Sequence, residues 1–394
     1  MDYPEVVITS FARTPVGSFL GSLSSLPAPQ LGSVAIAAAL KRSPGMAPEQ
    51  VNEVIMGHVL TSGVGQAPAR QAALGAGLPN SVETLTVNKV CGSGLKAVML
   101  AAQAIQSGNA KLIVAGGMES MSNVPYFLQG ARQGLRMGNR EFIDGMIHDG
   151  LWDVYHQIHM GSCVEICVRE LGYTRDQQDE YTVRSYKRVL AAQDGGIFDQ
   201  EIVPVEVPQR KGEPLIVNRD EEPVRVDFDK IPTLKPVFEK EGTITAANAS
   251  TISDGAAAVV VMSRALAEEL GIRPVASIIG QASTAQAPEW FTTAPAKAIS
   301  KVLDKTGLSL DDIDLFEINE AFAVVALAAI DELSLDPDKV NIHGGAVALG
   351  HPIGASGTRI LVTLLSAMEQ RDVWRGLAAV CIGGGEAAAM IVER

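Results

Sequence analysis

Cys91 stands where the chain changes from a strand pattern to a helix pattern. In TVNKVCGSGLKAV (86–98), a β-branched run precedes the cysteine, and glycines follow it closely. From Leu95 to Ile105 the apolar residues recur at helical spacing. The pattern predicts that Cys91 lies in the first turn of a helix, where free N–H groups and the positive end of the helix dipole lower the pKa of a thiol. A cysteine in that position can act as a nucleophile.

Two other interpretations of this stretch stay open. Free cysteine is among the residue types most often buried, so a small core side chain fits Cys91 equally well. The letters GSGLKA also match the dinucleotide-binding pattern G-x-G-x-x-A after a strand and before a helix. That pattern expects an acidic residue about 20 positions further on, at the end of a second strand. Glu119 comes later and follows two glycines, which makes dinucleotide binding the weakest of the three.

The C-terminal part of the chain carries groups that would serve a nucleophilic cysteine. GGAVALGHPIGASG (344–357) places His351 among five glycines, so a substrate can come close to one imidazole. A lone histidine in a loop is more usually a satisfied surface or core group. CIGGGEA places Cys381 beside three glycines, whose N–H groups could face an oxyanion. NEAFA places Asn319 where a strand becomes a helix, either to cap that helix or to hold a water.

The elements that must position these residues follow an alternating pattern. Short β-branched runs alternate with longer Ala- and Leu-rich segments of helical period. This alternation predicts an α/β fold with mostly parallel sheets. Between about residues 120 and 248 the alternation fades, and Gly, Pro, Arg and acidic residues increase. We expect this part to be a long inserted region that lies over the α/β core.

The two ends of the chain repeat one order of elements. Strand, glycine turn, helix, strand and Gly-Gly occur in LTVNKVCGSGLKAVMLAAQAI…KLIVAGGMES and again in VNIHGGAVALGHPIGASGTRILVTLLSAM…GLAAVCIGGGEA. Internal repetition of this kind predicts two similar halves. If the halves pack about a pseudo-twofold axis, Cys91 and His351 each begin an equivalent helix and approach one another at the centre.

Composition and charge exclude several classes of function. The chain has 394 residues, of which 47% are hydrophobic and 20% charged, as in a soluble protein with a large core. Its net charge is −13, from 32 basic and 45 acidic residues, without a dense basic cluster; nucleic acid is therefore a poor candidate partner. No uncharged apolar stretch approaches the about 18 residues that span a bilayer, and the N-terminus lacks a secretory pattern. We expect a cytoplasmic protein without a membrane partner.

The four cysteines are too few for a disulfide framework in so long a chain. Cys163 and Cys167 are four residues apart on a predicted helix and would form half of a metal site. No further Cys or His follows at ligand spacing, so buried apolar thiols are favoured and no metal is expected.

Taken together, these motifs resemble those of the thiolase family. The match runs through CGSG with Cys91, GGME at 116–119, NEAFA with Asn319, GGAVALGHPIGASG with His351 and CIGGG with Cys381, in the order and spacing of the family over essentially the whole chain. The resemblance implies a five-layered αβαβα fold of two similar βαβαβαββ-type halves, usually assembled as a homotetramer. It implies an N-terminal half formed by residues 1–119 and 249–271, an inserted loop domain at 120–248 that binds coenzyme A, and a C-terminal half at 272–394.

The resemblance also implies a mechanism. Cys91, relieved of its proton by His351, would attack an acyl-CoA thioester to give an acyl-cysteine, and Cys381 would act as the acid/base on the α-carbon. One oxyanion hole would form from the N–H groups of Cys91 and Gly383, and the other from His351 with a water held by Asn319. No metal or redox cofactor is implied, since the coenzyme A belongs to the substrate.

Substrate choice is likewise implied by family analogy. IHMGSCVE resembles the short-chain, acetoacetyl-CoA group, in which the His-Met pair, here His159 and Met160, narrows the acyl pocket. A 3-ketoacyl-CoA thiolase of broader chain length and a catalytically silent CoA- or lipid-binding protein are the alternatives. The residues implied at the coenzyme A site are Leu151, Phe238, Ala246 and Ser250, with Arg225, Lys230 and Lys235 as candidates for its phosphates.

Two departures bear on the subtype. Pro223 stands where potassium-activated relatives carry a tyrosine, and Thr292 follows Phe291 where acceptance of 2-methyl-branched substrates is associated with proline. We therefore expect neither potassium dependence nor branched-chain activity.

Overall fold

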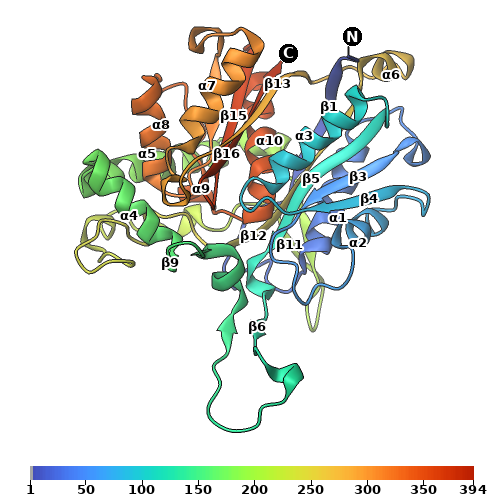
Figure 1. Cartoon of the computed structure of the whole chain (residues 1–394). Coiled ribbons are helices and arrows are strands. Elements are labelled where there is room, and N and C mark those ends of the chain that lie inside the picture. Colours follow the sequence, from blue (N-terminus) through green and yellow to red (C-terminus); the bar gives the residue numbers. More distant parts are fainter. Residues whose placement is uncertain (1–2) are drawn as a thin grey trace.

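The computed structural model describes residues 3–394 and is organised around one large sheet (Figure 1). Among these residues the sheet has ten strands in the order β14-β15-β16-β13-β1-β12-β5-β3-β4, with β2 paired to β12. The strands are β1 (Val6–Arg13), β2 (Gly17–Ser18), β3 (Glu53–Gly57), β4 (Glu83–Val87), β5 (Leu112–Ser120), β12 (Ser253–Ser263), β13 (Ala276–Ala285), β14 (Leu315–Ile318), β15 (Arg375–Ile382) and β16 (Glu386–Glu393). Its two halves meet at a short contact, where Val7 pairs with Ser277 and Ile8 with Ala276.

Helices cover both faces of each half of the sheet. The middle layer is formed by α3 (Ser93–Gln106) and α10 (Ile353–Arg371), and one core cluster joins them to strands of both halves. The outer layers are α1 (Ala28–Lys41) and α2 (Pro68–Gly75) on the first half, and α7 (Ala294–Thr306) and α8 (Ala323–Leu333) on the second. The predicted five-layered αβαβα fold of two similar halves is confirmed.

The prediction of mostly parallel sheets is wrong. Parallel pairing is confined, among the described residues, to β3 with β4 and β5 and to β14 with β15; the other strand pairs are antiparallel. The glycines after Cys381 explain part of the difference, since Gly384 and Gly385 have positive φ and turn β15 directly into β16. A turn this short can only join antiparallel neighbours, because a parallel connection needs a crossover of a dozen residues or more.

The two central helices pack closely because each has a glycine where the other helix approaches it. A Cβ at Gly357 of α10 would lie 2.4 Å from the backbone nitrogen of Leu95 in α3, and a Cβ at Gly94 would lie 2.7 Å from Oγ1 of Thr358. The helices also begin in equivalent ways. Gly92 is the N-cap of α3 and Pro352 is the N-cap of α10. Cys91 and His351 therefore each stand one residue before a cap, and Cys91 lies outside the first helical turn in which the sequence placed it.

Residues 120–248 carry little of the sheet, as the loss of alternation indicated. They form α4 (Met160–Leu171) and α5 (Arg175–Asp194) and three small hairpins, namely β6 (Tyr126–Phe127) with β7 (Ile143–Asp144), β8 (Trp152–Asp153) with β9 (Ile158–His159), and β10 (Val205–Val207) with β11 (Leu215–Val217). The β6–β7 arm projects from the body of the molecule (Figure 1). Two short helices, α6 (Arg264–Glu269) and α9 (Ala346–Leu349), lie outside this region.

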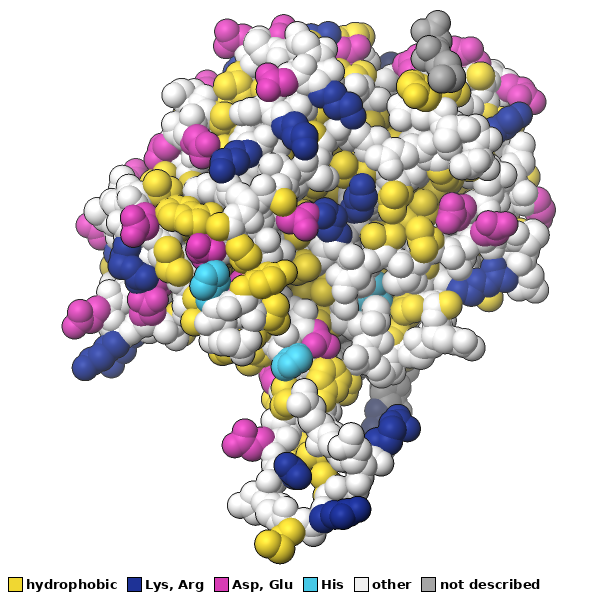
Figure 2. All heavy atoms as spheres, in the orientation of Figure 1, with side chains coloured by type: hydrophobic (Ala, Val, Ile, Leu, Met, Phe, Trp, Pro, Cys, Tyr) yellow, Lys and Arg dark blue, Asp and Glu magenta, His cyan; other side chains and the backbone are white. Residues whose placement is uncertain are grey.

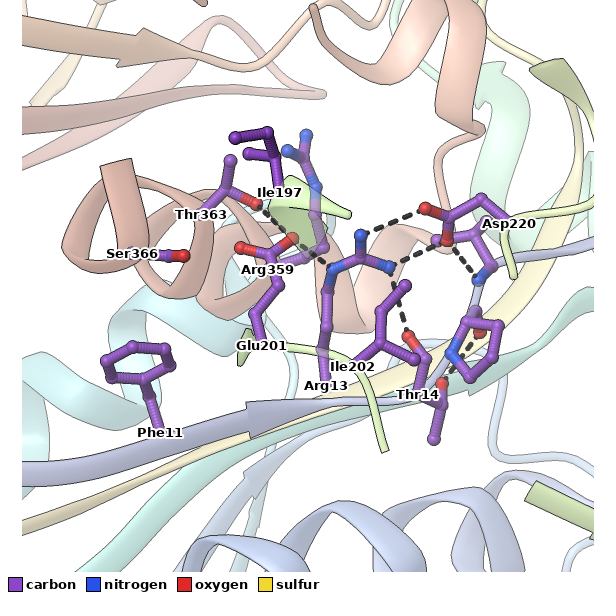
Figure 3. Close-up of polar contacts among 12 residues, drawn as sticks. Phe11, Arg13, Thr14, Ile197, Glu201, Ile202, Asp220, Arg359, Thr363 and Ser366 are labelled. Atoms are coloured by element: carbon purple, nitrogen blue, oxygen red, sulfur yellow. Dashed lines mark hydrogen bonds and ion pairs between the residues drawn. The ribbon is translucent and has the colours of Figure 1, made fainter. Parts of the chain in front are cut away.

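A buried ionic network ties this inserted region to the core (Figure 3). Arg13 at the end of β1 is fully buried, and it donates from Nε to Glu201 at 2.6 Å and from both Nη atoms to Asp220 at 2.7 and 2.9 Å. Thr363 of α10 donates to the same Glu201 oxygen at 3.3 Å. Removal of one partner from a buried pair leaves an unpaired charge, which destabilises a protein by about 3–5 kcal/mol. The inserted region is therefore held to the core by charge as well as by packing.

Every helix among the described residues is too short or too polar to reach across a lipid bilayer.

Candidate active site

A cavity of about 670 Å³ opens between the inserted region and the two halves of the core. Ten of the predicted site residues line it: Cys91, Leu151, His159, Met160, Arg225, Phe238, Ala246, Ser250, His351 and Gly383. Cys381 and Asn319 are fully buried beside the cavity. Cys381 packs in one apolar cluster with the lining residues Phe291 and Phe322, and the amide of Asn319 lies 3.5 Å from Nε2 of His351. Lys230 is not brought there. Its exposed ammonium pairs with Asp227 at 2.9 Å. The structure thus gathers residues that are up to 292 positions apart in the sequence.

Cys91 stands on a strained turn that sequence reasoning missed. The preceding residue, Val90, has φ of 45° in the left-handed region, which is a genuine outlier for a β-branched side chain. The turn is closed by Ser93, whose hydroxyl donates to the carbonyl of Val90 at 2.6 Å and accepts from the N–H of Lys89 at 2.8 Å. An ion pair of Lys89 with Glu386 holds the turn against β16. The surrounding structure thus fixes the sulfur at the cavity wall.

The expected lowering of the Cys91 pKa is wrong. Burial raises the pKa of this thiol to about 11, although part of the residue remains open to the cavity. Hydrogen bonds from the backbone N–H groups of Gly383 and of Cys91 itself act in the opposite direction, and the charge of Glu119 adds to the increase. The helix dipole acts mainly within the first turn, and Cys91 lies before it. Desolvation therefore prevails, and Cys91 in the free protein is a neutral thiol.

This pKa predicts a pH dependence for alkylation. Only the thiolate reacts with iodoacetamide, so the rate at Cys91 in the free protein should increase about tenfold per pH unit and level off near pH 11. Peptide mass analysis separates Cys91 from the three other cysteines. A plateau already reached near the ordinary thiol pKa of about 8.5 would contradict the burial argument.

His351 is held in one tautomer by its neighbour Ser356. The Ser356 hydroxyl donates to the carbonyl of Pro352 at 2.9 Å, so its oxygen accepts from Nδ1 of His351 at 2.6 Å. Nε2 is then left with its lone pair, and the amide of Asn319 lies 3.5 Å away. Burial, aided by the positive charge of Arg359, lowers the pKa of His351 to about 3. The imidazole is therefore neutral and able to accept a proton at Nε2.

Asn319 does not cap a helix. The N-cap of α8 is Phe322. Of the two roles considered for Asn319, holding a water therefore remains. Its Oδ1 is buried and has no hydrogen-bond partner among the described residues, and a buried amide oxygen in that state calls for a water or a ligand atom. Cys381, at the end of β15, is also fully buried. Burial raises the pKa of the Cys381 thiol well above its usual range, and the electrostatic effect of the nearby Cys91 raises this pKa further.

Aromatic side chains narrow one end of the cavity. The His159 ring stacks on Phe238 with a centroid distance of 4.6 Å, and Phe322 packs edge-on against Phe238 and Phe291. His159 also caps α4, because its Nδ1 accepts from the N–H of Gly161 at 3.1 Å. Burial lowers the pKa of this histidine. Met160 lies next to Gly383 on the same wall, since a Cβ at Gly383 would be 3.7 Å from Cε of Met160.

The mouth of the cavity carries one loosely paired cation. Arg225 is 56% exposed, and its guanidinium lies 3.9 Å from Glu221 and 3.8 Å from Glu222. Those distances exceed hydrogen-bond length, so the guanidinium remains able to bind an anion. Pro223 is buried in the 3-10 turn that carries Arg225. Cys163 and Cys167 are buried free thiols in α4, in agreement with their assignment as apolar side chains.

Comparison with known proteins yields one family throughout. A model of the thiolase N-terminal domain matches residues 6–265, and a model of the thiolase C-terminal domain matches residues 272–394. An acetyl-CoA acetyltransferase from Cupriavidus necator is 56% identical over 392 residues, which is 99% of each chain. The crystal structure of the Bacillus anthracis acetyl-CoA acetyltransferase superposes with a TM-score of 0.97 at 41% identity and covers 99% of both chains. That of Acat5 thiolase from Ascaris suum with coenzyme A gives 0.94 at 44%, covering 99% of this chain and 100% of that one.

Proposed function

The chain belongs to the thiolase family, and on that premise we propose that it is an acetyl-CoA C-acetyltransferase, which interconverts two acetyl-CoA with acetoacetyl-CoA and free coenzyme A. The observation that carries this proposal is the convergence of the Cys91 sulfur, two backbone N–H groups and the neutral His351 on one cavity. A second thiol, Cys381, lies directly behind them.

In the first step the sulfur of Cys91 bonds to the acetyl carbon of acetyl-CoA. Nε2 of His351 takes the thiol proton and passes it to the departing coenzyme A sulfur, which leaves acetyl-Cys91 and a free thiol. The N–H groups of Cys91 and Gly383 hydrogen bond to Sγ, and both are therefore close to the position where the oxyanion develops. Each such donor contributes about 3 kcal/mol to lowering the barrier.

In the second step Cys381, a thiol at rest, first passes its proton to Nε2 of His351, and the resulting thiolate removes the α-proton of a second acetyl-CoA. The α-carbon then bonds to the acetyl carbon of acetyl-Cys91, the carbon–sulfur bond to Cys91 breaks, and the leaving Cys91 sulfur takes the proton from His351. In cleavage these transfers run in reverse, and the Cys381 thiol returns a proton to the departing carbanion. The unpartnered Oδ1 of Asn319 and its amide, 3.5 Å from Nε2 of His351, fit the role of holding a water beside the second oxyanion. We propose that no metal or redox cofactor takes part, since proton transfers and thioester exchange complete the reaction.

The aromatic end of the cavity supports a short-chain substrate. We expect acetoacetyl-CoA to be cleaved with a kcat/KM at least about tenfold higher than a 3-ketoacyl-CoA with six more carbons, because the longer chain must displace Phe238 or Phe291. Cleavage rates are followed by loss of the 3-ketoacyl-CoA absorbance. Equal or faster cleavage of the longer substrate would identify a 3-ketoacyl-CoA thiolase of broader chain length instead.

The projecting β6–β7 arm supports assembly as a homotetramer. Its apolar side chains are exposed, with Met137 at 93%, Phe142 at 70% and Tyr126 at 64%, and basic and apolar side chains gather on it in Figure 2. Clustered exposed apolar groups mark protein contacts. Light scattering would report the mass of four chains, and the mass of a single chain would contradict the proposal.

The remaining proposals concern the setting of the enzyme. We place it in the cytoplasm and in fatty acid metabolism, which uses acyl-CoA thioesters. All four cysteines, each within the described residues, are free thiols, as a reducing compartment allows. Recovery of the protein in the soluble cell fraction without an organelle marker would test the location.

A further inference from the structure

Glu119, the last residue of the GGME motif, is buried where the two halves of the protein meet. It lies near the end of β5 and is 0% exposed. Its carboxylate accepts from the N–H groups of Val59 at 3.1 Å, Leu60 at 3.2 Å and Gly354 at 2.9 Å. Nε2 of the buried His58 lies 3.2 Å from its Oε1. Glu119 is not among the residues that line the cavity.

These contacts connect the segments that carry the two catalytic groups. Val59 and Leu60 follow β3 in the half that contains Cys91, whereas Gly354 lies in the first turn of α10, three residues after His351. His58 links the carboxylate further, since its N–H donates to the carbonyl of Val87, four residues before Cys91, at 2.9 Å. One side chain thus spans the joint between nucleophile and base.

The joint admits no larger residue on the helix side. A Cβ at Gly354 would lie 2.7 Å from Oε2 of Glu119, and a Cβ at Gly117 would lie 2.1 Å from the carbonyl oxygen of Gly354. A negative charge at the start of α10 is also favoured by the helix dipole. The carboxylate therefore fixes how far, and at what angle, α10 approaches the Cys91 half.

The same charge acts on the nucleophile. Burial is the main influence on the Cys91 thiol and raises its pKa; the N–H groups of Gly383 and of Cys91 favour the thiolate, and the charge of Glu119 makes a smaller contribution in favour of the neutral thiol. A charge on the Cys91 sulfur, when it forms, in turn raises the pKa of Cys381. Glu119 is therefore placed to affect Cys91 without touching a substrate.

We propose that Glu119 is a positioning residue for acyl transfer: its carboxylate sets the distance between the His351-bearing end of α10 and the Cys91 turn, and its charge acts on the Cys91 sulfur across that joint. The turnover part of this proposal rests on the proposed function; the effect on the thiol does not.

The test compares Glu119→Gln with the unchanged protein in two measurements. In the first, the pH midpoint of Cys91 alkylation by iodoacetamide, without coenzyme A, should decrease, because a like charge has been removed. In the second, kcat for acetoacetyl-CoA cleavage should fall about 10- to 100-fold with KM changed less than about threefold, since a catalytic pair displaced by 1 Å loses rate to this extent.

Two further variants separate charge from geometry. Glu119→Asp keeps the charge but shortens the reach, so it should retain the alkylation midpoint and lose kcat. Glu165→Gln is the matched control, because Glu165 is a carboxylate that is 1% exposed and accepts the N–H groups of Thr243 and Ile244 at 2.7 and 2.8 Å. It should lower the melting temperature and leave the Cys91 midpoint unchanged.

The outcomes decide the matter. An unchanged midpoint in Glu119→Gln, with only a lower melting temperature, overturns the proposal. If Glu119→Gln does not fold, Gly354→Ala tests the joint from the other side, where full kcat overturns the proposal and a 10-fold or larger loss supports it. If the unchanged protein cleaves no acetoacetyl-CoA, the proposed function fails, and the alkylation midpoints alone still decide the role of Glu119.

Discussion

Replacing Cys91 with alanine lowers kcat by at least about 10⁴-fold, the scale of loss when a covalent nucleophile is removed. Among the described residues it is the one thiol on the cavity wall, and Cys381 behind that wall is buried and protonated. Acetoacetyl-CoA cleavage measures the rate, and intact-protein mass after incubation with acetyl-CoA shows whether an acetyl group is attached.

The controls for this prediction come from the same chain. Cys91→Ala should still bind coenzyme A, because the contacts expected for this part of the substrate at Phe238, Ser250 and Arg225 remain. Cys163→Ala, which removes a fully buried thiol from α4, should keep turnover within about tenfold and lose stability instead. An acetylated Cys91→Ala protein, or one with normal turnover, would remove Cys91 from the mechanism.

Replacing Cys381 with alanine stops the complete reaction but spares its first half. We expect turnover to fall by about 10²–10⁴-fold, the usual contribution of a general acid/base. The acetyl transfer to Cys91 should survive, since it requires His351 and the Gly383 and Cys91 N–H groups rather than the second thiol. Rapid mixing with acetyl-CoA should give a burst of coenzyme A equal to one per site.

This half-reaction distinguishes the two sulfurs. The matched substitution is Cys91→Ala, in which no burst is expected. If both variants lose acetylation to the same extent, the roles assigned to the two cysteines are wrong. A burst followed by normal turnover in Cys381→Ala would place the acid/base elsewhere.

Much of the fold and the positions of the main site residues could be predicted from sequence, because glycine-rich turns and strand-to-helix changes are local. The repeat was sufficient to pair Cys91 with His351, since each precedes the cap of an equivalent helix. The strand directions were not predictable in the same way. They depend on how β12 returns from the inserted region and on the tight turn after Cys381, which the pattern of apolar runs does not record.

The protonation states and orientations of the site residues were harder to predict than which residues form the site. The Cys91 pKa depends on the balance of burial, two N–H groups and Glu119, and the named groups come from three segments that lie far apart in the sequence. The left-handed Val90, the orientation of His351 by Ser356 and the lack of contact between Lys230 and the cavity are likewise properties of the folded chain. The contact of Ser356 with His351 had one signal in the sequence, namely that the serine follows the histidine by five residues.

The buried contacts of Arg13 limit how this protein can be recombined. Its two carboxylate partners, Glu201 and Asp220, both come from the inserted region, while the arginine belongs to the first strand of the core. An inserted region taken from another protein would leave the Arg13 guanidinium buried without a counter-ion, unless that region placed two carboxylates at the positions of Glu201 and Asp220. The insertion is consequently not a portable module, and a chimaera that exchanges it has to exchange position 13 with it.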